Sequence, residues 1–151
     1  MRILNSDHKV DAVVWIQTAF LGDIILSTAG YKLLHSRFPN VKQYVITTPI
    51  GTELLKNERY LNPVVFDKKR DSLAKVRANL LSRLEHDFSA SRKSIQKNIV
   101  VLQQHRSVRS TLLALSLPFK SVGFNESLLS FFLHTHTTPK IAILHESQRA
   151  A

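Results

Sequence analysis

The hydrophobic pattern alternates between short, continuous apolar runs and longer segments with helical spacing. Runs typical of buried strands occur at 12–17, 43–47, 64–66, 98–102, 121–124 and 141–144. Helical spacing predicts helices over 24–38, 53–57, 72–86, 107–117 and 128–133. This alternation is typical of βαβ units, so we predict an α/β fold: a Rossmann-like parallel sheet with helices on both faces.

Two of these helices have a recognisable inner face. In the first helix, the residues expected to face the core are Ile24, Ile25, Thr28, Ala29, Leu33 and Leu34. In the helix over 72–86 they are Leu73, Val76, Leu80, Leu81 and Leu84. Ser72 is the expected N-cap of that second helix. Trp15 and Phe20 are expected in the core, rather than as platforms on which nucleic-acid bases stack.

We expect one domain over 12–144, an N-terminal extension over 1–11 and the polar start of a further segment over 145–151. No apolar run approaches the roughly 20 residues of a membrane span, and the N-terminus has no secretory pattern. The chain has no cysteine, which excludes disulfides, a thiolate zinc site and a catalytic cysteine. These features together favour a cytoplasmic protein.

Positive charge changes this picture, because it indicates an anionic partner. The net charge is +10 and the pI is about 10.2. Segment 67–109 alone contains 11 Lys and Arg against 4 Asp and Glu. Nucleic acid, an anionic membrane surface and a phosphorylated substrate all fit such a charge. A solvated helical face explains the basic segment equally well.

Candidate chemistry lies in the two polar loops that follow apolar strands, 18–23 and 103–110. In an open parallel sheet such loops meet at the carboxyl ends of the strands, where ligands bind. An ionised Asp23 at the start of its helix is a candidate general base, although Asp is also a common helix cap. Gly22 beside it permits a tight turn or the close approach of a ligand.

Arg106 and Arg109 are three residues apart near a helix start, so they can share a face and bind phosphate or carboxylate. A surface role without a ligand is the alternative. Two imidazoles, His134 and His136, have no evident third ligand, so we expect no metal site there. Neither a dinucleotide-binding GxGxxG nor a P-loop motif is present.

These loops together resemble the start of the lipopolysaccharide heptosyltransferase family, glycosyltransferase family 9. A strand is followed by Leu21-Gly22-Asp23 and a helix that ends in Arg37-Phe38-Pro39. Segment 102–110 resembles the family's Leu-Gln-Gly-Asn-x-Arg-Ser segment, with Gln104-His105 in place of Gly-Asn. Gly123-Phe124 and the His-x-x-x-Arg pattern at 145–149 also match. The resemblance covers nearly the whole chain.

The resemblance implies the N-terminal, acceptor-binding half of a GT-B fold, with the C-terminal donor domain absent from this chain. It implies inverting, metal-independent transfer of heptose from ADP-heptose to the lipopolysaccharide inner core, without a cofactor. Asp23 takes the position of the general base, and the candidate acceptor-binding residues are Gly22, Arg106, Arg109 and Ser110. The implied partners are a phosphorylated lipid A/Kdo-type acceptor, an anionic membrane surface and a separate donor domain. Without that domain we expect the 151-residue chain to be inactive.

Two other classes of function stay open. The first is a basic nucleic-acid-binding α/β domain, which the lack of aromatic residues within the basic segment disfavours. The second is a non-catalytic remnant or interaction module. A donor domain added to such a module would produce no transfer.

Overall fold

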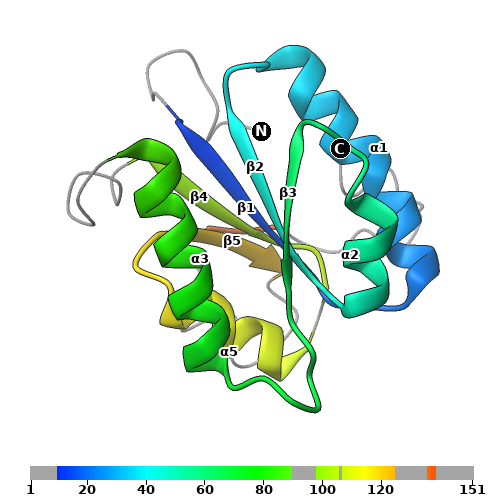
Figure 1. The fold of residues 1–151 in the computed structure, drawn as a ribbon, viewed down its shortest axis with the longest axis vertical. Coiled ribbons are helices and arrows are strands. Elements are labelled where there is room, and N and C mark those ends of the chain that lie inside the picture. The colour runs from blue at the N-terminus through cyan, green and yellow to red at the C-terminus, as the bar shows by residue number, and fades with distance from the viewer. Residues whose placement is uncertain (1–9, 90–97, 106, 125–135, 139–151) are drawn as a thin grey trace.

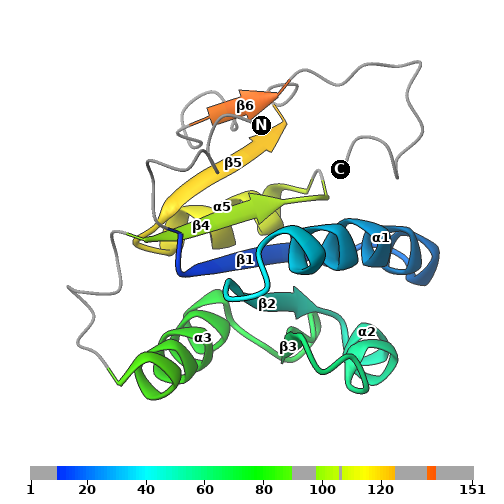
Figure 2. The same cartoon turned by 90° about the horizontal axis from the view of Figure 1, so that it is seen from above.

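The computed structural model describes residues 10–89, 98–105, 107–124 and 136–138. Its centre is a six-stranded sheet in the order β3-β2-β1-β4-β5-β6, in which every neighbouring pair is parallel (Figures 1 and 2). The strands are β1 Ala12–Gln17, β2 Lys42–Thr47, β3 Leu61–Val65, β4 Ile99–Gln103, β5 Lys120–Phe124 and β6 His136–Thr138. The predicted parallel α/β sheet is confirmed.

Helices cover both faces of the sheet. They are α1 Leu21–Arg37, α2 Pro49–Leu55, α3 Leu73–Phe88 and α5 Val108–Ser116. In Figure 2, α1 and α2 cover one face of the sheet, and α3 and α5 pack on the other face. This is the layering expected when parallel strands are joined by helical crossovers.

The core consists of two layers that share the central strand. Ala12, Val14 and Ile16 pack with the inner sides of α3 and α5. Val13 and Trp15 alternate with them and pack against α1 and α2. All six residues of β1 are therefore buried, which explains its continuous apolar run.

Strand β1 and helix α3 match the predicted elements closely. β1 has the predicted bounds, Ala12–Gln17. The Ser72 side chain accepts a hydrogen bond from the Lys75 backbone N–H and caps α3, as predicted. The α3 side chains predicted to face inward are buried, and Leu73 is partly buried against the same layer.

Helix α1 differs from the prediction at its start and in its inner face. It begins at Leu21 rather than residue 24, with Phe20 at the N-cap making no side-chain capping bond. Its buried residues are Ile24, Ser27, Gly30, Tyr31 and Leu34. Ile25 and Leu33, expected inside, are 49% and 40% exposed. The small Ser27 and Gly30 let the helix lie close to the sheet, and the Ser27 hydroxyl accepts a 2.7 Å hydrogen bond from the buried Gln17 amide.

The prediction of Phe20 as a core residue is wrong, because its side chain is 85% exposed. Phe20 is the N-cap of α1, so its side chain lies outside the part of the core that α1 covers. Trp15 is buried as predicted, and its indole N–H donates a 3.0 Å hydrogen bond to Gln43.

Smaller differences concern turns and edges. α2 begins at Pro49, four residues early, because the Thr48 hydroxyl accepts from the Gly51 N–H and caps it. β3 contains Pro63, which its position at the edge of the sheet permits. The β-branched residues at 137–138 form part of β6, where no strand was expected.

The predicted helix 128–133, the strand 141–144, and the segments 1–11 and 145–151 lie wholly or almost wholly outside the described residues. Among the described helices, none combines the length and the hydropathy that crossing a membrane requires.

Candidate active site

Loops from three strands meet at the carboxyl edge of the sheet, around the end of β1. The Thr18 and Ser110 hydroxyls are 2.9 Å apart, and the Gln104 N–H donates to the Ile16 carbonyl. The Lys68 ammonium donates a 2.6 Å hydrogen bond to the Thr18 carbonyl. The prediction that loops 18–23 and 103–110 open on one edge is therefore confirmed, with the loop after β3 added to them.

This meeting point has a topological reason. The chain moves from β1 outward to β2 and β3, and then returns to place β4 on the other side of β1. Crossovers on opposite faces diverge there, between β1 and β4. Such a switch point is where open α/β sheets bind ligands.

Asp23 is the third residue of α1 and is half-buried. Phe20 holds the N-cap position, so Asp23 is not the residue that caps the helix. Within the described part of the chain, no hydrogen bond or ion pair involves its carboxylate. Asp23 thus presents a carboxylate that can accept a proton.

Gly22 precedes Asp23 in the exposed first turn of α1. Its φ is not positive, so the backbone there does not require glycine. A Cβ added at Gly22 would meet no atom within 4 Å. Of the two predicted reasons for this glycine, a tight turn is excluded by the helical backbone. With glycine at position 22, the space beside the Asp23 backbone stays open.

His105 lies close enough to Lys68 and Asp23 for the charges of those two residues to shift its pKa. Burial lowers the pKa of His105, the Lys68 charge lowers it further, and the Asp23 charge opposes both. Burial also lowers the pKa of Lys68, with a smaller contribution from Arg109. His105 therefore lies between a carboxylate and a cation, and Lys68 and Arg109 place positive charge on the same edge. Neither Lys68 nor His105 was among the sequence candidates, because only the fold brings them together.

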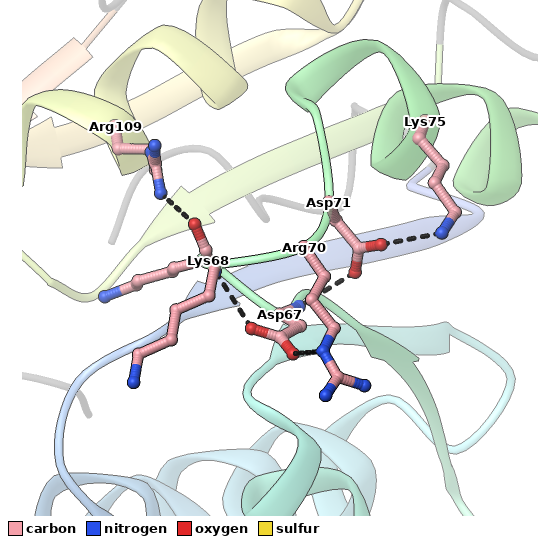
Figure 3. A network of polar contacts seen from close by, with 7 residues as sticks. Asp67, Lys68, Arg70, Asp71, Lys75 and Arg109 are labelled. Carbon is pink, nitrogen blue, oxygen red and sulfur yellow. Dashed lines mark hydrogen bonds and ion pairs between the residues drawn. The ribbon is translucent and has the colours of Figure 1, made fainter.

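Arg109 lies in the exposed first turn of α5 and bridges to the loop after β3 (Figure 3). Its guanidinium donates a hydrogen bond to the Lys68 carbonyl. Arg106, its predicted companion, lies outside the described residues. A shared anion site of Arg106 and Arg109 therefore stays a prediction.

Carboxylates hold the loop that carries Lys68 (Figure 3). Asp67 accepts a hydrogen bond from the Lys69 N–H, and Asp71 accepts one from the Asp67 N–H. Lys75 bonds Asp71 at 2.8 Å and holds the pKa of that carboxyl below its ordinary value. Hydrogen bonds of Asp67 and Asp71 thus fix the start and the end of this loop.

Ser110 is fully buried, and its hydroxyl lies 2.9 Å from Thr18 and 2.8 Å from the Ser107 hydroxyl. Ser107 in turn caps α5 by accepting from the Ser110 N–H. Ser110 therefore joins the start of α5 to the end of β1. Its predicted contact with the acceptor becomes, on this geometry, a positioning role.

No three His, Asp or Glu side chains converge as a metal site in the part of the chain that the structure covers. Among the described residues, the chemistry available at this edge comes from the unpartnered Asp23 carboxylate, the His105 imidazole and several cations.

The fold is similar to those of several solved structures. E. coli heptosyltransferase WaaC with ADP matches with a TM-score of 0.69 and 14% identity, over 92% of this chain and 44% of that one. The same enzyme with ADP-2-deoxy-2-fluoro heptose gives 0.67 and 14%, over 92% and 45%. A family 9 glycosyl transferase from Veillonella parvula DSM 2008 gives 0.70 and 19%, over 94% and 40%. The fold is heptosyltransferase-like.

The predicted resemblance to heptosyltransferases is thereby confirmed as a likeness of fold. The chain spans less than half the length of these heptosyltransferase-like structures. No family model matches the sequence, and no curated protein matches it either.

Proposed function

We propose that this chain is the acceptor-binding half of a heptosyltransferase-like glycosyltransferase. Its reaction is the inverting, metal-independent transfer of heptose from ADP-heptose to a phosphorylated, Kdo-type lipid A acceptor. The observation that carries the proposal is Asp23, an unpartnered carboxylate among the described residues, on the first turn of α1 at the sheet's switch point. The likeness of the fold to WaaC, solved with ADP and with a fluorinated ADP-heptose, supports the choice of donor.

In this proposal Asp23 acts as the general base. Its carboxylate takes the proton of an acceptor hydroxyl while that oxygen bonds to the anomeric carbon of the heptose. The bond from that carbon to the β-phosphate oxygen breaks on the opposite side, so ADP leaves with the bonding electron pair and the anomeric configuration inverts.

Basic groups around Asp23 hold the acceptor. Arg109 and Lys68 carry charge to the same edge, and Arg106 is assigned with them from the sequence. Guanidinium groups match phosphate and carboxylate oxygens in geometry as well as in charge. Gly22 leaves room for the sugar next to the base.

A donor-binding half, supplied by another domain or another chain, completes the cleft. We therefore propose that the 151 residues alone bind acceptor but transfer no sugar. The site of action is the cytoplasmic side of the membrane that contains the acceptor.

The first test measures binding and transfer with a deacylated acceptor. Calorimetry follows binding of that acceptor to the chain. Transfer is then measured with ADP-heptose and the separately produced donor-binding half of a heptosyltransferase. Asp23→Asn should reduce transfer by at least about a hundredfold, because general-base catalysis contributes that much or more. Acceptor binding should change little.

Glu53→Gln is the matched control, because Glu53 is an exposed carboxylate on α2 whose ion pair with Lys56 is at the surface. It should transfer as fast as the unmodified chain. Full transfer by Asp23→Asn would contradict the assignment of the base. Absence of acceptor binding by the unmodified chain would contradict the proposed function.

A further inference from the structure

We propose that the start of α1 and the exposed side of α2 form a docking surface for an anionic lipid bilayer. This apolar rim consists of Phe20, Leu21, Ile25, Ile50 and Leu54. The inference rests on the proposed function, because an acceptor anchored in a membrane requires the catalytic edge to reach the bilayer surface. It adds which residues make that contact.

The rim is unusually exposed for apolar side chains. Phe20 is 85% exposed and Ile50 is 65% exposed. Leu21, Ile25 and Leu54 are between 42% and 49% exposed. Contiguous exposed apolar surface of this kind marks a binding site more often than it marks a free surface.

The two helices bring these side chains together. Gly51 of α2 packs so closely on Ile24 of α1 that an added Cβ would lie 2.9 Å from the Ile24 side chain. Ile50 and Ile25 are the sequence neighbours of Gly51 and Ile24, and both are exposed. The rim residues therefore come from the starts of α1 and α2, which lie side by side in Figures 1 and 2, and from the rest of the short helix α2.

Phe20 occupies a position that helix chemistry would give to another residue. It is the N-cap of α1 and makes no capping bond, although Ser, Thr, Asp and Asn are strongly preferred there. Its ring does not pack in the core either. A residue that departs from the local helix preference and gains no packing in exchange is expected at a functional position.

Charge on the same edge selects an anionic bilayer as the occupant. Lys68 bonds the Thr18 carbonyl, two residues before Phe20, so its loop lies next to the rim. Lys69 and Arg70 on this loop are exposed, and Arg109 bonds the loop backbone. Apolar side chains flanked by Lys and Arg are the pattern of peripheral proteins that bind anionic lipid surfaces.

The rim also lies where an acceptor in a membrane needs it. Asp23 follows Phe20 and Leu21 within the same turn of α1. A rim inserted among lipid headgroups would thus hold the carboxylate within a few ångströms of the membrane surface. The sugar hydroxyl of an acceptor anchored there is in reach without being lifted out.

Vesicle sedimentation tests the surface without any acceptor or donor. The 151-residue chain is mixed with vesicles of phosphatidylcholine alone, or of equal parts phosphatidylcholine and phosphatidylglycerol. Binding is expected to the anionic vesicles and to weaken with salt. Phe20→Ser and Ile50→Ser should each weaken it by about fivefold or more, since each removes an apolar side chain from the contact.

Leu33→Ser is the control, because Leu33 is a 40% exposed apolar residue further along α1, outside the rim. It should bind like the unmodified chain. Ser is favourable at an N-cap, so Phe20→Ser is expected to fold, which circular dichroism checks. Equal vesicle binding by all three variants, or no vesicle binding by the unmodified chain, would refute the proposal that the rim binds a bilayer.

Three further outcomes separate the alternatives. If deacylated acceptor binds but vesicles do not, the surface is refuted while the proposed function stands. Sedimentation velocity without lipid tests the other occupants. A dimer that Phe20→Ser abolishes would assign the rim to a second copy of this chain and would refute the lipid contact. A complex with the separately produced donor-binding half that Phe20→Ser abolishes, with vesicle binding unchanged by that substitution, would assign the rim to that half and would also refute the lipid contact.

Discussion

At the residue scale, the start of α1 combines an exposed aromatic N-cap, a helical glycine and an unpartnered carboxylate within four positions. Phe20 and Gly22 are poor choices for helix stability, whereas a carboxylate in the first turn is a favourable one. Phe20 caps nothing, and Gly22 has the lowest helix propensity after proline. The turn is better understood as a surface that contacts other molecules.

Gly22→Ala should separate stability from function. The added methyl meets no neighbour, so the change should stabilise the protein by up to about 1 kcal/mol through helix propensity. If the open space receives the acceptor, affinity for the deacylated acceptor should fall. Urea denaturation and calorimetry measure the two effects. Increased stability with unchanged affinity would remove Gly22 from the site.

At the element scale, α2 depends on another glycine for its place. A Cβ at Gly51 would lie 2.3 Å from the Thr47 hydroxyl oxygen, where β2 ends. Gly51→Ala should therefore destabilise the fold by about 1–3 kcal/mol, the usual cost of overpacking. Gly22→Ala serves as its control, because the same substitution there has the opposite sign. An unchanged denaturation midpoint would show that α2 shifts at little cost.

The end of α3 is tied to β2 by a hydrogen bond that depends on charge. The Tyr44 hydroxyl donates to Asp87 at 2.6 Å and, more than any other group, holds the pKa of that carboxyl below its ordinary value. Burial, and then the hydrogen bond to Asp87 and the Asp87 charge, raise the pKa of Tyr44, so its hydroxyl keeps its proton.

Tyr44→Phe should cost about 1.5–3 kcal/mol at neutral pH, typical of a hydrogen bond to a charged group. A depressed folded pKa stabilises the protein above the ordinary carboxyl pKa of about 3.9 and loses that effect as the pH falls through the folded value. The difference between Tyr44→Phe and the unmodified chain should therefore shrink in acid. Denaturation at a series of pH values measures it, and a difference independent of pH would assign it to packing alone.

At the scale of the whole molecule, periodicity was sufficient for the sheet and its layers. A buried strand such as Ala12–Gln17 and a capped amphipathic helix such as α3 have signals that are local. The start of α1 has none, because Phe20 offers no capping oxygen, so Leu21-Gly22-Asp23 looks like a loop.

The inner face of α1 was predicted from apolar residues, whereas the structure buries Ser27, Gly30 and Tyr31. These residues suit the core only because Gln17 and Gln104 offer hydrogen-bond partners to Ser27 and Tyr31. Asp23 and Arg109 were found from local motifs. Lys68 and His105 join them through the fold, which no local pattern encodes.

The central position of the first strand has a consequence for the order of assembly. Thr18 and Ser110 are hydrogen-bonded across 92 positions of the chain, and one long side of β1 pairs only with β4. During synthesis, β1 must wait with that side unpaired until β4 has left the ribosome. Domains with such distant pairings fold slowly and expose strand edges meanwhile. The candidate catalytic edge is therefore among the last parts of the molecule to form, and a nascent chain stalled before β4 would contain Asp23 without its site.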